Sequence, residues 1–363
     1  MRTDPIRVAL IGLGKMGLSH LAIVNTHPEA RLVAVCDSAS YVTEVLSRYT
    51  GLKAYGDYRR MLDEVRPDAV LVATPPGTHA AIVQAALERN SHVYCEKPLC
   101  TDAAESRRLA NLAQAKGLVN QVGYHYRFVA AFQEAKRLLD AGVIGPIHHF
   151  RAEAYGPVVV RPAGATWRTS RAAGGGCLYD YACHAIDMVH YLVGRPEGVA
   201  GTVLNRMFSE EAEDEVYATL LYGDGKTGQL AANWSDDSLR KMALRVTLWG
   251  ANGRIYADRQ EVQLYLRKPV AEARGLVPGW NVRYTTALTP PVWFYLRGEE
   301  YSAQLDHFIQ CARRGSPDTL CSFRAGAEAD EVAAMLVKNA AGAPLDAPFP
   351  VRERVPFSTA LEP

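Results

Sequence analysis

One stretch of the sequence, residues 174–187 (GGGCLYDYACHAID), gathers several side chains that catalysis or metal binding can use. If a helix begins near Cys177, then Asp180, His184 and Asp187 stand at positions i, i+4 and i+7 and share one face. Three interpretations are open at this point. The stretch is a metal site, a catalytic helix, or a glycine turn followed by a buried helix.

The cysteine spacing argues against a metal. Zinc ligands come in converging pairs, typically about two to four residues apart, whereas Cys177 and Cys183 are six positions apart. We therefore predict no metal ligand. A lone histidine on a helix ordinarily satisfies a local hydrogen bond, but Asp180 lies one turn before His184 on the same face, which weakens that interpretation.

Length and composition limit the number of domains, the kinds of partner and the cellular compartment of this protein. A chain of 363 residues exceeds one ordinary hydrophobic core, so we expect two domains. The net charge is +1 and no basic cluster is present, which disfavours nucleic acid and anionic membranes as partners. No apolar run is as long as a membrane span or a secretory signal. Seven scattered cysteines without a CxxC pair indicate a reduced, cytoplasmic compartment.

The first third of the chain alternates between strand and helix patterns. Continuous apolar strands separated by helices are typical of a parallel sheet covered on both faces. The alternation ends near residues 123–128, where we place the domain boundary. Later apolar runs broken by glycine turns indicate antiparallel strands. The predicted strands are 6–11, 31–36, 69–73, 92–95 and 118–122, the predicted helices 18–24, 41–49, 61–65, 80–89 and 101–116, and the later strands 216–222, 230–234 and 245–249.

A glycine motif follows the first predicted strand. Gly12, Gly14 and Gly17 form GxGxxG at the start of a helix, and Asp37 ends the next strand. This order is the dinucleotide-binding fingerprint, in which the glycines allow a tight turn, approach of the pyrophosphate and close helix packing. The alternative is a glycine turn without a cofactor.

Asp37 bears on the choice of cofactor. A carboxylate at this position accepts hydrogen bonds from the adenosine ribose and repels a 2′-phosphate. The next residues, Ser38 to Ser40, include no arginine that would hold such a phosphate. The sequence therefore favours NAD over NADP, unless Asp37 is an exposed loop residue or a helix cap.

Several motifs together resemble the Gfo/Idh/MocA family of sugar and inositol oxidoreductases. These are GLGKMG with His20 downstream, Asp37, CEKPL at 95–99, the stretch 174–187, and YSAQLDHFIQCARRG at 301–315. The resemblance covers essentially the whole chain. It implies an α/β protein with an N-terminal Rossmann domain (1–125) that binds NAD(P). It also implies a C-terminal α/β domain (126–363) with a large, mostly antiparallel open sheet for substrate and subunit contacts, and hence a homodimer or homotetramer.

The resemblance also implies an activity. It is that of an NAD(P)-dependent dehydrogenase or reductase, which transfers a hydride between the nicotinamide and a secondary alcohol or ketone of a sugar or inositol. Lys97, Asp180 and His184 occupy the family's catalytic positions. Pro98 restricts Lys97 to extended conformations, and the family typically has a cis bond there.

Chemistry assigns the three residues separate roles. His184 would accept the hydroxyl proton because its unperturbed pKa lies near working pH. Lys97 would stabilise the developing alkoxide, and Asp180 would hold Lys97 or a substrate hydroxyl. Asp187 is left open between substrate binding and a hydrogen bond to neighbouring backbone or another helix.

Other contacts follow from the family's loops. The loop from Thr74 to His79 is expected beside the adenosine and pyrophosphate. The pair Trp167–Arg168 is expected to reach the cofactor, although both could equally be substrate or interface residues. Candidate substrate neighbours, which could equally be packing residues, are Tyr124, His125, Arg127, Tyr155, Tyr179 and Tyr181. The predicted cofactor-binding residues are Gly12, Leu13, Gly14, Lys15, Met16, Gly17, Asp37, Ser38, Thr74, Pro75, Pro76, His79, Glu96, Lys97, Trp167 and Arg168.

Two alternatives to this function stay open. One is a nicotinamide-binding sensor without turnover, although a sensor has no chemical reason to keep Lys97, Asp180 and His184 together. The other is an enzyme of the same family specific for a dihydrodiol or a nucleotide sugar. The sequence does not decide the substrate, the direction of the reaction, or dimer against tetramer.

Overall fold

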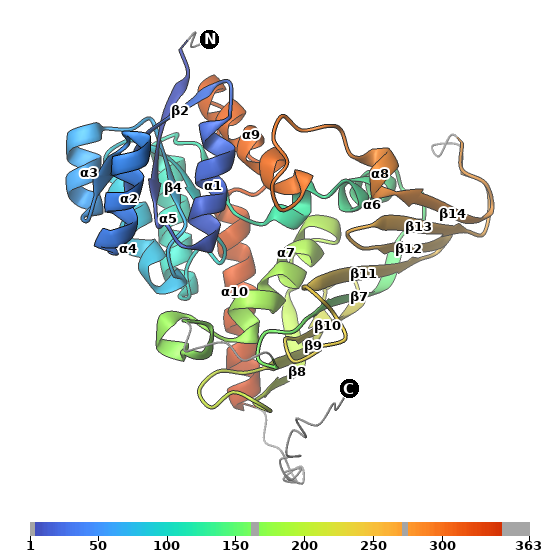
Figure 1. Ribbon diagram of the computed structural model, residues 1–363. Coiled ribbons are helices and arrows are strands. Elements are labelled where there is room, and N and C mark those ends of the chain that lie inside the picture. Colours follow the sequence, from blue (N-terminus) through green and yellow to red (C-terminus); the bar gives the residue numbers. More distant parts are fainter. Residues whose placement is uncertain (1–3, 161–166, 271–274, 343–363) are drawn as a thin grey trace, which may run out of the picture.

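Six short strands form a parallel sheet in the N-terminal part of the chain (Figure 1). The structure is a computed structural model and describes residues 4–160, 167–270 and 275–342. The sheet has the order β3-β2-β1-β4-β5-β6, and all its neighbours are parallel. Its strands are β1 (Ile6–Ile11), β2 (Ala30–Cys36), β3 (Lys53–Tyr55), β4 (Ala69–Val72), β5 (His92–Cys95) and β6 (Asn120–Val122).

Helices cover both faces of this sheet, which is why its central strands are apolar on both sides. One face packs against α1 (Lys15–Asn25), α2 (Ser40–Thr50) and α9 (Glu299–Arg314). The other packs against α3 (Tyr58–Val65), α4 (His79–Glu88), α5 (Ala103–Ala115) and α10 (Phe323–Gly342). Two C-terminal helices therefore complete the core of the N-terminal sheet.

The predicted strands and helices of this part are confirmed, with small differences. The edge strand β3 was not predicted, because three residues with only partly buried side chains carry little pattern. Helix α5 begins after Asp102, whose carboxylate caps it by accepting a hydrogen bond from Ala104 N at 2.8 Å.

A second sheet of eight strands follows, in the order β14-β13-β12-β11-β7-β10-β9-β8. Every neighbouring pair is antiparallel except β7 and β10, which are parallel. This confirms the mostly antiparallel open sheet. Its strands are β7 (Ile147–Tyr155), β8 (Gly198–Asn205), β9 (Glu215–Leu221), β10 (Thr227–Asn233), β11 (Ala243–Gly250), β12 (Gly253–Ala257), β13 (Glu261–Leu266) and β14 (Gly279–Tyr284).

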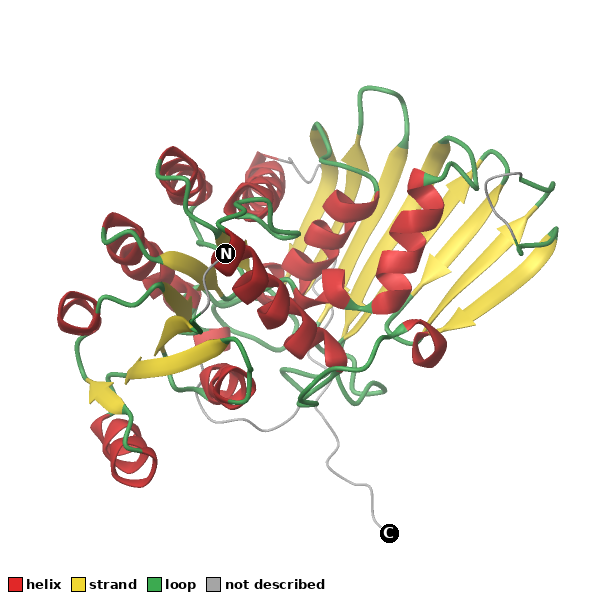
Figure 2. Ribbon diagram, turned by 90° about the horizontal axis from the view of Figure 1, so that it is seen from above, coloured by secondary structure: helices red, strands yellow, loops and turns green. Residues whose placement is uncertain are grey.

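Only one face of the second sheet is covered by helices within the described residues (Figure 2). These helices are α6 (Ala130–Asp140), α7 (Cys183–Leu192) and α10, while the short α8 (Thr285–Leu288) lies near the β14 edge. Side chains along β11 alternate accordingly, with Val246 and Leu248 buried and Thr247 and Trp249 partly exposed on the other face. That open face carries large exposed side chains near its edge, including Trp280.

The two sheets are joined by packed helices as well as by the chain. Helix α10 contacts α5 and β6 on one side and α7 and β8 on the other (Figure 1). None of the helices in the described ranges is long and apolar enough to cross a membrane. Each of the seven cysteines is a buried free thiol.

Candidate active site

A cleft of ≈ 1730 Å³ opens at the carboxyl ends of the parallel strands, between them and the C-terminal part of the chain. Loops that follow β1, β2, β4 and β5 supply one wall, which is where open α/β sheets bind ligands. Asp180 and His184 line the opposite wall together with loops near the second sheet. The predicted cofactor loop and the predicted catalytic helix therefore face the same space.

The glycine loop has room for a dinucleotide. Gly12 has φ +96°, and a Cβ there would lie 2.5 Å from the Ala73 carbonyl oxygen. A Cβ on Gly17 would lie 1.8 Å from the Gly12 oxygen, so this glycine packs the helix on the turn. A Cβ on Gly14 would meet nothing within 4 Å, and this glycine lines the cleft beside the first turn of α1. The free backbone amides of that turn suit a pyrophosphate.

Asp37 lies at the end of β2 and lines the same cleft. Its carboxylate accepts hydrogen bonds from Leu13 N at 2.6 Å and Ala39 N at 2.8 Å. Asp37 therefore ties the glycine loop to the end of β2 while keeping a negative charge in the cleft wall. Leu13 itself is buried and does not line the cleft, so it contributes its backbone amide to the loop and its side chain to the core.

The loop after β4 places Thr74, Pro75 and Pro76 in the cleft but not His79. The His79 ring is buried, with Nδ1 2.9 Å from the Pro98 carbonyl oxygen and Nε2 2.9 Å from that of Thr74. Burial lowers the pKa of this histidine, so it is neutral. It was predicted as a cofactor contact, and the structure instead places it behind the cleft wall, holding two loops together.

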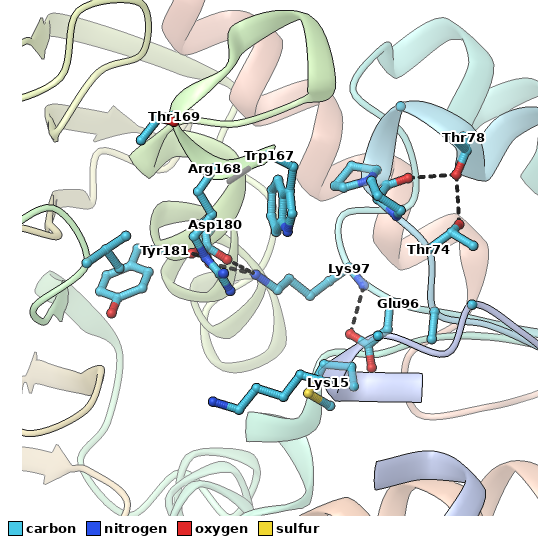
Figure 3. A pocket seen from close by; sticks show the side chains of 18 of the residues that line it. Lys15, Thr74, Thr78, Glu96, Lys97, Trp167, Arg168, Thr169, Asp180 and Tyr181 are labelled. Carbon is cyan, nitrogen blue, oxygen red and sulfur yellow. Dashed lines mark hydrogen bonds and ion pairs between the residues drawn. The ribbon is translucent and has the colours of Figure 1, made fainter. Parts of the chain in front are cut away.

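Lys97 reaches across the cleft to Asp180 (Figure 3). Its Nζ donates to Asp180 Oδ1 and to the Asp180 carbonyl oxygen, each at 2.8 Å, and the Lys97–Pro98 bond is cis. Arg168 Nε donates to the other carboxylate oxygen of Asp180 at 2.8 Å. One carboxylate thus bridges two cations.

The charges of this cluster fix its protonation states. Burial opposes the charged forms, but the carboxylate of Asp180 outweighs it and raises the pKa of Lys97. In the same way burial would raise the pKa of Asp180, yet Lys97 and Arg168 hold it below its usual range. Both groups are charged at neutral pH. An ammonium has three N–H donors, and two of them go to Asp180, so one remains for a ligand.

The helix that carries Asp180 is not regular. Residues Leu178–Ala182 form a π-helix that continues into α7, and one residue more per turn shifts the faces of the helix. Of the three residues predicted to share one face, Asp180 and His184 therefore reach the cleft and Asp187 does not.

Asp187 instead pairs with a buried arginine. Its Oδ1 accepts from Arg127 Nη2 at 2.6 Å, and both side chains are buried. Arg127 also donates to the Leu320 carbonyl oxygen at 2.8 Å. Of the two roles left open for Asp187, the structure supports a bond to a neighbouring element and places this aspartate in the scaffold of α7.

His184 lies among aromatic rings. The ring centroids of His125 and Tyr126 are 5.1 and 5.3 Å from its own. Its Nδ1 is buried and has no hydrogen-bond partner among the described residues, which leaves Nε2 as the atom for the cleft. Burial and then the charge of Lys97 lower the pKa of His184 well below its usual value. The expectation that it titrates near working pH is not met, and the imidazole is neutral.

Glu96 is hydrogen-bonded both to α1 and to the loop that carries Lys97. His20 Nε2 lies 2.6 Å from Glu96 Oε1, and Lys97 N donates to Glu96 Oε2 at 3.3 Å. Burial would raise the pKa of Glu96, but the hydrogen bond from His20 holds it low. Glu96 lines the cleft as a half-buried carboxylate.

The remaining predictions divide in two. Lys15, Met16, Ser38, Trp167 and Arg168 line the cleft with the loops described above. Of the possible substrate neighbours, His125 and Tyr181 line the cleft, whereas Tyr124, Arg127, Tyr155 and Tyr179 do not.

Sequence reasoning missed one group of cleft residues. These come from loops around the second sheet and from the region where α9 begins, so no local spacing marks them. They include Arg240, Lys241, Met242, Arg259, Arg297 and Tyr301. In the described ranges, no group of three or more His, Cys, Asp or Glu residues is arranged to hold a metal ion.

Comparison with known proteins matches both parts of the chain. Residues 6–124 match a family described as "Oxidoreductase family, NAD-binding Rossmann fold", and residues 132–256 match the "GFO/IDH/MocA C-terminal domain". A scyllo-inositol 2-dehydrogenase (NAD(+)) of Bacillus subtilis is 28% identical over 321 residues, which is 85% of this chain and 87% of that protein.

Two further relatives extend the comparison. A dTDP-3,4-didehydro-2,6-dideoxy-alpha-D-glucose 3-reductase of Saccharopolyspora spinosa is 30% identical over 257 residues, 70% of this chain and 75% of its own. The structure of levoglucosan dehydrogenase in complex with NADH and levoglucosan superposes with a TM-score of 0.81 at 26% identity. That superposition covers 93% of this chain and 98% of the other.

Proposed function

Because the chain belongs to the Gfo/Idh/MocA family of NAD-dependent oxidoreductases, we propose that it interconverts a secondary alcohol and a ketone of a sugar or an inositol. The observation that carries this proposal is the convergence of Lys97, Asp180 and His184 on the cleft that the glycine loop also lines. The named relatives act on an inositol, an anhydrosugar and a nucleotide sugar, which supports a polyol substrate.

The roles of the catalytic residues follow from their charges. Bound NAD supplies the hydride acceptor in the oxidative direction. Lys97, held protonated by Asp180, directs its third N–H at the reacting oxygen and stabilises negative charge on it. His184, neutral at working pH, accepts the hydroxyl proton on Nε2. Asp180 holds Lys97 and Arg168 in place.

We propose that the glycine loop, Asp37, Ser38 and residues 74–76 hold the dinucleotide, with Lys15, Met16, Glu96, Trp167 and Arg168 at its edge. All of these except Leu13 and Gly17 of the loop line the cleft. The charge of Asp37 favours NAD over NADP. Residues 1–125 then form the cofactor domain and residues 126–363 the substrate and assembly domain, with α9 and α10 returning to the first sheet.

We also propose a homodimer or homotetramer that assembles through the open face of the eight-stranded sheet. On that face the Tyr265 and Trp280 rings lie 5.3 Å apart, and both side chains are exposed. Exposed aromatic patches of this kind mark interaction surfaces. Seven buried free thiols support a reducing, cytoplasmic location.

The test is a substrate panel. Inositols, aldoses and sugar acids are offered with NAD or NADP, and NADH formation is followed by absorbance. We expect NAD-dependent oxidation of at least one polyol, and its loss in Lys97→Ala with NADH binding retained. A protein that binds NADH but turns over none of the panel, and whose Lys97→Ala variant behaves identically, would be a sensor rather than an enzyme.

A further inference from the structure

Two arginines from the C-terminal part of the chain lie in the cleft beyond the catalytic residues. Arg259 follows β12, Arg297 precedes α9, and both line the cleft. The charge of Arg259 is compensated, because its Nη2 forms an ion pair with the buried carboxylate of Glu300. The same nitrogen donates to the Arg297 carbonyl oxygen at 3.0 Å.

Arg297 has no acidic partner among the described residues. Its guanidinium carbon lies 5.5 Å from the centre of the Tyr301 ring, a cation–π contact. Its Nε is buried and has no hydrogen-bond partner within the described part of the chain. The backbone at Arg297 has φ +68°, which is uncommon for a residue other than glycine, and the bond from Arg259 to its carbonyl oxygen holds it there.

A continuous wall of rings connects Arg297 to the reacting end of the cleft. Tyr301 stacks on His125, with ring centroids 4.6 Å apart and planes at 18°. The His125 ring is 5.1 Å from that of His184. Burial, with the nearby charges of Arg259, Lys97 and Arg297, lowers the pKa of His125 to about 3. His125 is therefore neutral and adds no positive charge to that of Arg297.

On the basis of the function proposed above, we propose that Arg297 binds a carboxylate on the substrate, which is therefore an acidic sugar or polyol. Its reacting hydroxyl would lie at Lys97 and His184, and its carboxylate would lie on the far side of His125. Guanidinium and carboxylate match in shape and charge and form paired, charge-assisted hydrogen bonds. A guanidinium carries one positive charge, which a carboxylate matches with one negative charge, whereas a phosphate carries more. A neutral sugar would leave Arg297 without a counter-charge.

Binding to the NADH-loaded protein tests this without requiring turnover. Isothermal titration calorimetry would compare D-glucuronate with D-glucose, D-galacturonate with D-galactose, and D-gluconate with D-glucitol, and D-glucose 6-phosphate would report on phosphate. We expect at least one acid to bind about ten-fold or more tightly than its neutral partner, as a charge-assisted pair predicts. Arg297→Gln should remove that difference, and Arg297→Lys should retain part of it. Both should bind NADH as the wild type does.

Arg314→Gln is the matched control, because Arg314 is an exposed arginine in the last turn of α9 and does not line the cleft. It should keep the preference for the acid. The proposal is overturned if no acid binds more tightly than its neutral partner, if Arg297→Gln keeps the preference, or if only the phosphate binds tightly. Oxidation of neutral sugars at rates that Arg297→Gln leaves unchanged would reject the acidic substrate and keep the proposed function. Arg297-dependent binding of an acid without any hydride transfer would support the carboxylate site and reject the proposed function.

Discussion

Replacing Asp180 with asparagine should lower the pKa of Lys97, so that the lysine loses its charge at a lower pH. The shape of the site should stay the same. The Lys97 Nζ to Asp180 Oδ1 distance is 2.8 Å, and the two side chains are only 14% and 7% exposed. At an effective dielectric constant of about 20, two unit charges at that distance attract by about 6 kcal/mol. Breaking a buried ion pair from one side is strongly destabilising, typically by about 3–5 kcal/mol, and we take this range.

The loss has two expected effects. Without the carboxylate, burial and the charge of Arg168 remain to lower the pKa of Lys97, so the alkaline limb of the pH–rate profile moves to lower pH. If the whole loss of about 3–5 kcal/mol appears in the transition state, the rate falls about 10²- to 10⁴-fold. Initial rates measured over a range of pH show the shift of the alkaline limb. Competitive acetylation of lysines, read by mass spectrometry, follows the protonation of Lys97 without any substrate.

Asp140→Asn is the matched control. Asp140 pairs with Lys136 at i,i+4 on the exposed face of α6, where such pairs contribute little. It should leave both assays unchanged. If Asp180→Asn lowers the rate by the same factor at every pH and leaves the labelling of Lys97 as in the wild type, then Asp180 does not hold the lysine charge and our assignment of its role is wrong.

Three further predictions concern the cofactor, the base and the stability of the fold. Asp37→Ser should raise the ratio of kcat/KM for NADP over NAD by about ten-fold or more, since a repulsive charge is removed; a wild type that already prefers NADP would contradict this. The pKa of His184 is depressed, so kcat/KM should show no ionisation near the usual histidine pKa of about 6.5, and a limb there in the wild type that disappears in His184→Gln would refute the neutral imidazole. Asp330 is buried, accepts from Ser106 Oγ at 2.6 Å and Cys100 N at 3.1 Å, and burial raises its pKa to about 7. Between the unfolded pKa of about 4 and the folded one, the native state keeps a proton that the unfolded state has lost. Stability from this residue is therefore present at low pH and falls as pH rises through that window, by about 4 kcal/mol at most. Denaturant unfolding of Asp330→Asn, which keeps the hydrogen bonds without the charge, should lack this part of the pH dependence, and identical slopes in both proteins would count against it.

The cofactor wall could be predicted because its signals are local. Gly12 and Asp37 each follow a strand directly and Gly14 immediately precedes α1, so a strand end and a residue type are enough to place them. The strands of the second sheet were predicted less completely. Because one face of this sheet is open, residues along strands such as β7 and β12–β14 alternate between more and less buried positions. Such short patterns are weak signals without a known partner strand.

The catalytic wall could be predicted only in part. Asp180 and His184 are four residues apart, and this spacing survives in the structure because both still line the cleft. Asp187 lies farther along α7 and pairs with the buried Arg127, a partner distant in sequence that a helical wheel does not reveal. Arg259 and Arg297 carry no local signal at all. Their position depends on how the loop after β12 meets the start of α9, which is a property of the fold rather than of a motif.

The packing of α9 on the first sheet has a consequence for the order in which the protein is made. Val8 and Leu10 of β1 leave the ribosome early, and the same core includes Leu305 and Phe308 of α9, which are synthesised some 300 residues later. Until then the part of this face that α9 covers stays exposed beside α1 and α2, and an exposed apolar surface of this kind aggregates or engages chaperones. A message truncated before residue 299 would encode the complete glycine loop and Lys97, yet its product would lack the helix that closes this core. Completion of the chain, rather than of its first domain, therefore sets when this core is closed.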